Sequence, residues 1–297
     1  MSSGAWERSL SRAIYGLSAI TGLAAFVYPF FLPSVVKDAA MGQSHSHDAP
    51  LLLVGLVGVC LAAVLLEVQA QAGGAKRVAL VGMLVSMNAI LRFAEVAMPG
   101  PGGFSPIFFL IVLTGYTYGG GFGFLMGAMT LLVSALITAG VGPWLPYQMF
   151  TAGWVGMSAA LCRPLVSWLG WHAEWPEVVI LAGFNGIWGL LYGAIMNVWF
   201  WPFAIGPAEQ HWQPGMAWTD AIGHYALFYA ATSLAWDAMR LLGNVILTLS
   251  FGLPTLRALR RFQRRFDFSW SAAPSGPLPR RGENAPTTGT NLRGGGL

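Results

Sequence analysis

Charged residues are scarce in this sequence: only 9% of its 297 residues are Asp, Glu, Lys or Arg, against roughly 25% in soluble domains. The hydrophobic fraction is 55%, and a water-soluble protein of this size has no core large enough to bury that much apolar surface. The composition therefore excludes a soluble globular enzyme and a disordered chain.

Cysteine is also rare, and the sequence lacks the motifs of two large enzyme classes. Its two cysteines, Cys60 and Cys162, lie in apolar runs and are interpreted as buried small hydrophobic residues, which excludes a disulfide scaffold. There is no P-loop motif G-x-x-x-x-G-K-[S/T], so the chain cannot hydrolyse ATP by that machinery, and there is no H-E-x-x-H zinc motif. If the protein moves a solute, we expect another subunit to supply the energy.

Apolar runs near 20 residues long recur throughout the chain, and this is about the length that crosses a bilayer. We therefore predict an all-α integral membrane protein. A signal peptide is the alternative for the first run, but that run is long for one. The last run, 221–253, would form a helix about 50 Å long, against a hydrocarbon core of about 30 Å, so we expect 221–235 to lie on or angle into the outer surface. The predicted spans are 13–32, 50–70, 77–97, 104–118, 120–140, 146–166, 178–201 and 236–256.

Basic residues are distributed as the positive-inside rule requires. With both termini placed in the cytoplasm, 13 of the 16 Lys and Arg residues fall in cytoplasmic segments. The formal net charge of +4 therefore reflects topology in a multi-pass cell-membrane protein, and no nucleic-acid partner is expected. We predict three parts: two N-terminal transmembrane helices with an external His-containing loop (1–74), a six-helix membrane domain (75–262) and a basic, disordered cytoplasmic tail (263–297).

Polar side chains within the predicted spans are the candidate site. Ionisable residues are costly in lipid and usually face a bundle interior or a water-filled cavity. Asn88, Arg92 and Glu95 share one helix face, as do Asp237 and Arg240 together with Asn244. Arg92, Asp237 and Arg240 are expected in the outer third of the membrane. The predicted substrate-binding residues are Asn88, Arg92, Glu95, Trp144, Tyr147, Gln148, Tyr192, Asn197, Asp237 and Arg240.

Each of these candidates also has a purely structural interpretation. Arg92 with Glu95, and Asp237 with Arg240, have the i,i+3 spacing of ion pairs within one helix. The tryptophans near the outer face suit an interfacial aromatic belt. His45 and His47 offer too few ligands in one loop for a convincing metal site, so no metal is predicted.

Small residues recur at four-residue spacing, which lets membrane helices approach closely. The repeats comprise Gly119, Gly123 and Gly127, the pairs Gly189–Gly193 and Ala182–Gly186, and a pair formed by Ala75 and Ala79 at the start of the six-helix unit. They predict a compact bundle.

Four stretches within residues 75–261 resemble the substrate-binding membrane subunit, or S component, of energy-coupling factor (ECF) vitamin transporters. They are PGGFSPIFFLIVLTGYTYGGGFGFLMGA, GVGPWLPYQMFTAGWVGMSAAL, NVWFWPF and TSLAWDAMRLLGNVILTLSFGLPTLRALRRF. The resemblance implies a six-helix bundle that captures a vitamin or related micronutrient from outside, beneath loops 98–103, 140–146 and 202–220. The two helices before residue 75 depart from that six-helix pattern.

The same resemblance implies the partners. An S component assembles with a transmembrane coupling protein and two cytoplasmic ABC ATPases, so ATP is used by the partners and no cofactor is bound by this chain. Small residues on the first helix of the unit dock the coupling protein in that family, which maps onto Ala75 and Ala79. The alternative is an integral membrane enzyme or lipid-handling protein that uses intramembrane Arg, Glu and Asp.

Overall fold

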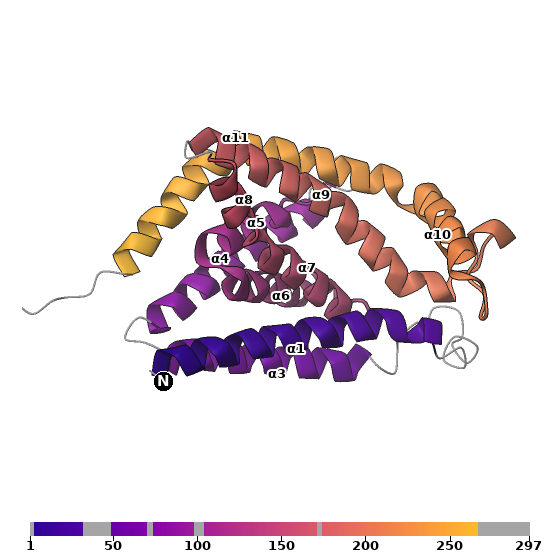
Figure 1. Ribbon diagram of the computed structural model, residues 1–297, viewed down its shortest axis with the longest axis horizontal. Coiled ribbons are helices and arrows are strands. Elements are labelled where there is room, and N and C mark those ends of the chain that lie inside the picture. Colours follow the sequence, from indigo (N-terminus) through magenta and orange to yellow (C-terminus); the bar gives the residue numbers. More distant parts are fainter. Residues whose placement is uncertain (1–2, 32–48, 70–73, 98–103, 171–173, 267–297) are drawn as a thin grey trace, which may run out of the picture.

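The computed structural model describes residues 3–31, 49–69, 74–97, 104–170 and 174–266, and every regular element in these residues is helical (Figure 1). Five of the described helices are long and apolar enough to cross a membrane, which confirms the predicted all-α membrane fold. The α-helices are α1 (Ser3–Phe31), α3 (Ala49–Gln69), α4 (Gly74–Ala97), α5 (Ile107–Tyr118), α6 (Gly120–Ile137), α7 (Leu145–Ala159), α8 (Cys162–Trp168), α9 (Glu174–Phe200), α10 (Trp218–Thr232) and α11 (Leu234–Phe266). Two short 3-10 helices are η1 (Trp201–Phe203) and η2 (Ala208–Gln210).

The central helix α5 is too short to span a bilayer alone. Its 12 residues extend about 18 Å, against a hydrocarbon core of about 30 Å. Every residue from Ile107 to Thr117 is buried, because α4, α6, α7, α9 and α11 all contact the helix. The sequence predicted a span over 104–118, whereas the structure has a core helix whose side chains contact protein.

Glycines bring α6 and α7 into backbone contact. A methyl group at Gly123 would lie 2.2 Å from the carbonyl oxygen of Gly156, and one at Gly127 would lie 2.1 Å from that of Ala152. The predicted close packing is therefore confirmed for Gly123 and Gly127. Gly119 has a different role, because it connects α5 to α6 with a φ of +104°, a conformation that glycine adopts at little cost.

Helices α9 and α11 lie side by side along one edge of the molecule (Figure 1). Gly186 faces the side chain of Val245, and Gly189 faces the backbone of Leu241. Helix α11 has 33 residues and includes Pro254. It continues past the predicted span to Phe266.

The first residues of the predicted disordered tail are thus helical, because α11 extends four residues past residue 262. The remainder of that tail lies outside the described residues.

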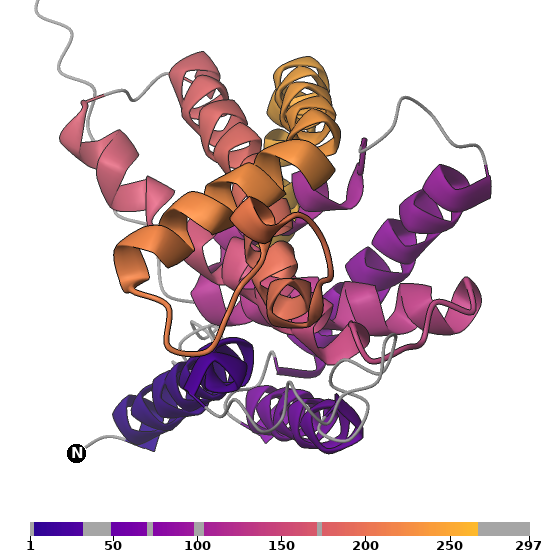
Figure 2. The same ribbon diagram turned by 90° about the vertical axis from the view of Figure 1, so that its right-hand side faces the viewer.

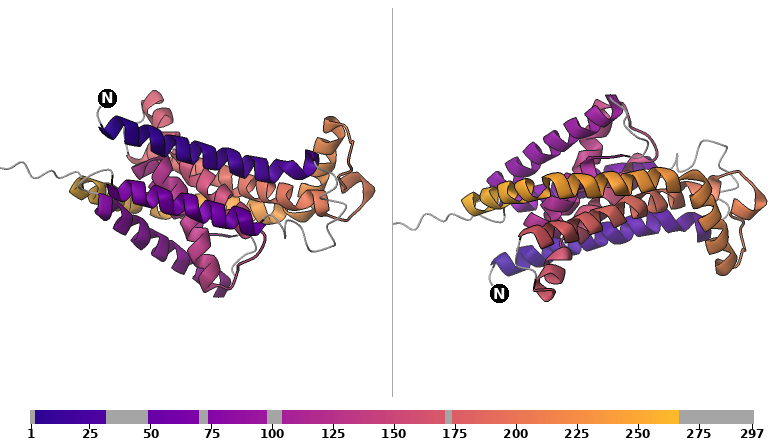
Figure 3. Two further views of the ribbon diagram at one scale, coloured as in Figure 1. Left: turned by 90° about the horizontal axis from the view of Figure 1, so that it is seen from below. Right: turned by 90° about the horizontal axis from the view of Figure 1, so that it is seen from above.

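Helices α1 and α3 lie along the opposite side of the bundle from α9 and α11 (Figure 1; Figure 3). The buried residues Leu56 and Cys60 of α3 belong to the same apolar core as Leu80 and Leu84 of α4. Helix α1 packs against α7, and Gly22 allows this approach because a methyl group there would meet the ring of Phe150 at 2.7 Å. The start of α1 and the end of α11 lie at the same end of the molecule (Figure 3).

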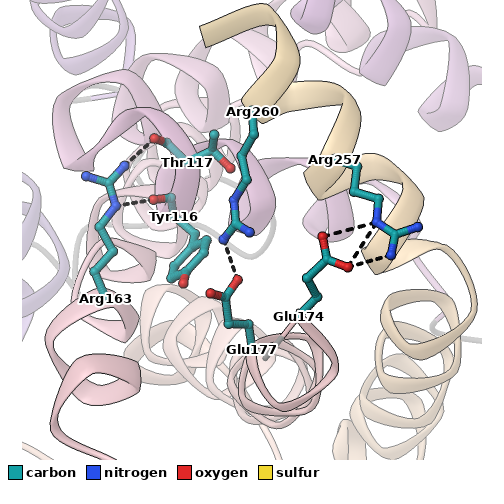
Figure 4. A network of polar contacts seen from close by, with 7 residues as sticks. All are labelled: Tyr116, Thr117, Arg163, Glu174, Glu177, Arg257 and Arg260. Carbon is teal, nitrogen blue, oxygen red and sulfur yellow. Dashed lines mark hydrogen bonds and ion pairs between the residues drawn. The ribbon is translucent and has the colours of Figure 1, made fainter. Parts of the chain in front are cut away.

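We call this the basic end, after Arg257, Arg260, Arg261 and Arg264 of α11. Two ion pairs join the start of α9 to α11 there (Figure 4). Glu174 binds Arg257, with Nε of the arginine 3.1 Å from each carboxylate oxygen, and Glu177 binds Arg260.

The connection from α7 to α9 also lies at the basic end. Helix α7 ends at Ala159 and α8 begins at Cys162, so the predicted span 146–166 is divided between two helices. Arg163 donates hydrogen bonds to the carbonyl oxygens of Tyr116 and Thr117 (Figure 4). Backbone carbonyls in the last turn of a helix have no N–H donor from a following turn. The two bonds from Arg163 satisfy two such carbonyls of α5.

At the other end, which we call the loop end, α10 lies across the end of the bundle (Figure 2). Residues 201–217 lead into it through η1 and η2. The sequence predicted a separate helix over 221–235 in this position, and the structure places one at Trp218–Thr232.

Candidate functional site

A buried ion pair on α11 forms the centre of the candidate site. The guanidinium of Arg240 binds the carboxylate of Asp237, whose exposed fraction is only 2%. Arg240 Nη1 also lies 3.4 Å from the carbonyl oxygen of Gly189. The carboxylate fits between the two helices because Gly193 has no side chain; a methyl group there would lie 1.8 Å from Asp237 Oδ2.

Helix α4 contributes a second carboxylate and a second guanidinium. Glu95 accepts a hydrogen bond of 2.9 Å from Ser105 Oγ and interacts electrostatically with Arg92 and Arg240. Charges from α4 and α11 therefore act on one another across the bundle. Two arginines and two carboxylates give this cluster no formal net charge.

Tyr192 of α9 completes this group, which we call the charged cluster: Arg92, Glu95, Tyr192, Asp237 and Arg240. The Arg240 guanidinium carbon lies 5.5 Å from the centre of the Tyr192 ring, in cation–π geometry. Tyr192 also interacts electrostatically with Arg92 and Glu95. The Phe108 and Tyr192 rings pack edge-to-face, with centroids 4.7 Å apart, so the Tyr192 ring is fixed beside both arginines.

A second tyrosine approaches the cluster from outside the spanning helices. Tyr229 of α10 interacts with the Asp237 carboxylate. Burial, followed by the negative charge of Asp237, raises the pKa of Tyr229 to about 12. Its hydroxyl therefore stays protonated at physiological pH and is available as a donor.

Three buried asparagines extend the hydrogen-bonding groups into the bundle core. Asn88 donates to the carbonyl oxygen of Ile107 at 3.1 Å and to Thr130 Oγ1 at 3.2 Å. Asn185 donates to Thr248 Oγ1 at 3.0 Å. Each leaves its own amide oxygen unbonded, and both amide atoms of the fully buried Asn244 are unbonded.

A buried amide group without a hydrogen-bond partner costs stability. The unbonded amide atoms of these asparagines are unused donors and acceptors near the candidate site.

The charged cluster thus brings together five of the ten residues that the sequence predicted to bind substrate. Asn88 lies one turn earlier on α4 and bonds to α5 and α6. Asn197 lies nearer the loop end and donates to Ser233 Oγ at 2.7 Å. The binding roles of all ten remain predictions.

The other three predicted residues lie apart from the charges. Trp144 donates its indole N–H to the carbonyl oxygen of Gly140 at 3.1 Å and is 40% exposed. Tyr147 is fully buried and packs edge-to-face against Phe26 of α1, with centroids 5.0 Å apart. Gln148 is half-buried beside it on α7. Tyr147 therefore contacts an N-terminal helix whose position the sequence did not predict.

The site also contains residues that the sequence did not predict. Ser105 donates a hydrogen bond to Glu95 and Tyr229 interacts electrostatically with Asp237, but serine and tyrosine near helix ends are too common to be informative alone. Asn185 carried a usable signal, because an amide in the middle of an apolar span needs a partner.

Ala75 and Ala79, the predicted docking residues, are both exposed on α4. Their surface is therefore available to another chain, although α3 packs against α4. The predictions for His45, His47 and loop 98–103 fall outside the described residues. No group of three potential metal ligands occurs in the part of the chain that the structure describes.

A separate apolar groove of about 480 Å³ lies between α1, α3 and α7. Its lining includes Leu17, Leu51 and Phe150, with Ser18 and Thr21 as its polar members. This lining suits hydrocarbon rather than a charged solute, so the groove is distinct from the charged cluster.

Comparison with known proteins agrees with the architecture of the six-helix unit. A family model for the substrate-specific component of ECF transporters matches residues 76–253, which is more than half of the chain. No curated protein and no solved structure shows significant similarity to the chain. The match begins at α4 and includes every member of the charged cluster. The chain therefore belongs to the family of substrate-specific components of ECF transporters, which are transporter subunits and not enzymes.

Proposed function

We propose that the protein captures a small polar micronutrient, a vitamin or a related compound, from outside the cell for ATP-driven uptake. The observation that carries this proposal is the convergence of α4, α9 and α11 on one charged cluster. Buried charges in a membrane protein are expensive and usually mark a substrate site or pathway. The energy comes from a transmembrane coupling protein and two cytoplasmic ABC ATPases.

The distribution of charge supports an inward basic end. Arg257, Arg260, Arg261 and Arg264 lie in the last third of α11, and arginine is enriched on the cytoplasmic side of membrane proteins. In this orientation both termini are cytoplasmic and the loop end faces outward. The charged cluster then lies on the side from which an importer receives its substrate.

The balance of charges indicates the substrate chemistry. Because the charged cluster is formally neutral, a zwitterionic or uncharged polar solute can exchange with its ion pairs without leaving an excess charge in the membrane. Tyr192 offers an aromatic ring beside both arginines, and the buried asparagines offer donors and acceptors. A thiamine-like, riboflavin-like or corrinoid compound meets this description.

The first experiment is mass spectrometry of small molecules retained by gently purified protein. Binding of the retained compound is then compared between wild type and Arg92→Ala, with Lys76→Ala as the control because it removes a cation from the same helix at the basic end. Losing a hydrogen bond to a charged group should weaken binding about 10- to 100-fold. Arg240→Lys, which keeps the charge but loses the planar guanidinium, should give an intermediate loss.

Equal binding by wild type and Arg92→Ala, with both folded, would refute the site. Turnover of a lipid by the purified protein would instead support the membrane-enzyme alternative. Copurification tests the partners: Ala79→Leu places a large side chain on the exposed face of α4 and should reduce recovery of the coupling protein and ATPases. Leu91→Ala, also on an exposed part of α4, is the control for that assay.

A further inference from the structure

The C-terminal end of α1 is aromatic and contacts the chain segment that leads from α9 to α10. The Phe30 ring lies 5.9 Å from that of Trp201 and 5.4 Å from that of Trp212, with the second pair edge-to-face. Phe31 lies 6.0 Å from Trp218, at the start of α10. An N-terminal helix thus packs on a segment more than 170 residues later in the chain.

That segment, residues 201–217, which we call the cover segment, is held in a folded conformation. The Trp201 indole N–H donates to the carbonyl oxygen of Gln210 at 2.9 Å, which closes η1 onto η2. Trp201 and Trp212 are only 4% and 6% exposed and form one apolar cluster, with Phe30 packed against it. Without the Phe30 ring, part of both indoles would lose its packing partner.

The cover segment is also connected to the charged cluster. The Tyr225 ring of α10 lies edge-on to Trp201 at 5.0 Å, and its hydroxyl donates to the carbonyl oxygen of Ala194 on α9. Tyr225 stacks on Tyr229, whose hydroxyl interacts with Asp237. Contacts therefore run from α1 through the cover segment to α10, whose Tyr229 interacts electrostatically with the buried carboxylate.

Helix α1 lies outside the region that the family model matches, which begins at residue 76. We propose that Phe30 is a positioning residue that holds the cover segment closed over the loop end. By doing so it limits how fast a solute enters and leaves the charged cluster. The effect on solute entry and exit rests on the proposed function, whereas the positioning of the cover segment by Phe30 concerns the structure alone.

Hydrogen–deuterium exchange of the full-length protein in lipid nanodiscs tests, without any ligand, whether Phe30 holds the cover segment. In Phe30→Ala, amides of the cover segment and α10 should exchange at least about tenfold faster than in wild type, because the segment loses two aromatic contacts. Amides of α5 and of the α9–α11 contact should keep their wild-type rates. Phe251→Ala, the same truncation at an exposed position of α11, should leave all these rates unchanged.

Two results would overturn the inference. Unchanged exchange of the cover segment in folded Phe30→Ala would show that Phe30 does not hold it. A uniform increase across all helices would show that Phe30 is only a general stabilising contact. Phe30→Tyr, which keeps the ring, should restore slow exchange, and if Phe30→Ala does not fold, Phe30→Leu is judged by the same criteria.

The limit on solute entry and exit is tested with the compound that wild-type protein retains in native mass spectrometry. After dilution, this compound should dissociate at least about tenfold faster from Phe30→Ala than from Phe251→Ala. Equal dissociation rates, with faster exchange in the cover segment, would show that the segment does not limit access. If wild type retains no compound, the proposed function is contradicted, while the exchange experiment still decides the role of Phe30.

Discussion

Gly189→Ala should weaken the contact between α9 and α11 that holds the charged cluster together. A methyl group at position 189 would lie 2.8 Å from the backbone nitrogen of Leu241 and 2.9 Å from its Cα. These are backbone atoms of a helix, so no side-chain rotation relieves the contact. The two helices must separate by about 0.6 Å to reach the 3.4 Å of ordinary van der Waals contact.

The expected cost combines two opposing effects. Forcing an extra methyl group into a packed contact costs about 1–3 kcal/mol, while replacing glycine by alanine within a helix contributes about 0.5–1 kcal/mol of stability. The net loss is therefore about 0–2.5 kcal/mol, or up to about 10 °C in melting temperature for a domain of this size. Arg240 Nη1, which lies 3.4 Å from the Gly189 carbonyl oxygen, should lose that contact.

The assay is thermal unfolding of the purified protein, with Gly183→Ala as the matched control. Gly183 lies on the same helix, and a methyl group there would meet nothing within 4 Å. This control should melt at or above the wild-type temperature, because only the helix-propensity gain applies. If Gly189→Ala and Gly183→Ala melt at the same temperature, the close approach of α9 and α11 is not as described.

Further predictions concern charge and titration. Arg240→Ala leaves the buried Asp237 carboxylate without its ion pair. It should destabilise the protein by about 3–5 kcal/mol, measured by thermal unfolding. Asp237→Leu combined with Arg240→Met should recover most of this loss of stability, but the double variant should retain no ligand. Burial raises the pKa of Tyr229 from 10.0 to about 12. Its contribution to stability should therefore be constant from pH 6 to 9 and be lost as pH rises from about 10 to about 12, and the stability difference between wild type and Tyr229→Phe, measured from pH 6 upward, checks this. Burial raises the pKa of the Cys162 thiol from 9.0 to about 11, so its thiolate fraction at pH 7.5 is about 100-fold below that of an ordinary cysteine; alkylation should be slow until detergent denaturation exposes it, and rapid labelling of folded protein would contradict its burial.

Periodicity and charge placement predicted most of this fold because bilayer thickness constrains both. A run such as 178–201 is long enough to span, and the basic residues after Pro254 mark one end of the last span. The close packing at Gly123 and Gly127 followed from spacing alone, because small residues at four-residue intervals form a flat helix face. The separate helix over Trp218–Thr232 followed from a length that one span cannot accommodate.

The errors have an equally physical origin. Hydropathy cannot distinguish a helix that faces lipid from one that faces protein, so the 12-residue α5 was predicted as a span. The predicted span 146–166 was broken before its end, where Arg163 reaches back to cap α5, and such a long-range contact has no local sequence signature. The contact of Phe26 with Tyr147 was not predicted either, because it depends on how α1 docks, and the binding role of Tyr147 stays a prediction.

The Asp237–Arg240 pair also shows why stability alone does not explain the charged cluster. Replacing a buried ion pair by apolar residues of similar volume is often neutral or stabilising by about 1–4 kcal/mol, and the lipid-facing sides of the same helices are already apolar. This protein nevertheless leaves position 193 without a side chain, so that the carboxylate fits between α9 and α11, and positions Tyr192 under the guanidinium. Three helices thus bury charges that lower the stability of the bundle relative to apolar side chains. This loss of stability has an explanation if the charges exchange their internal partners for those of a bound solute.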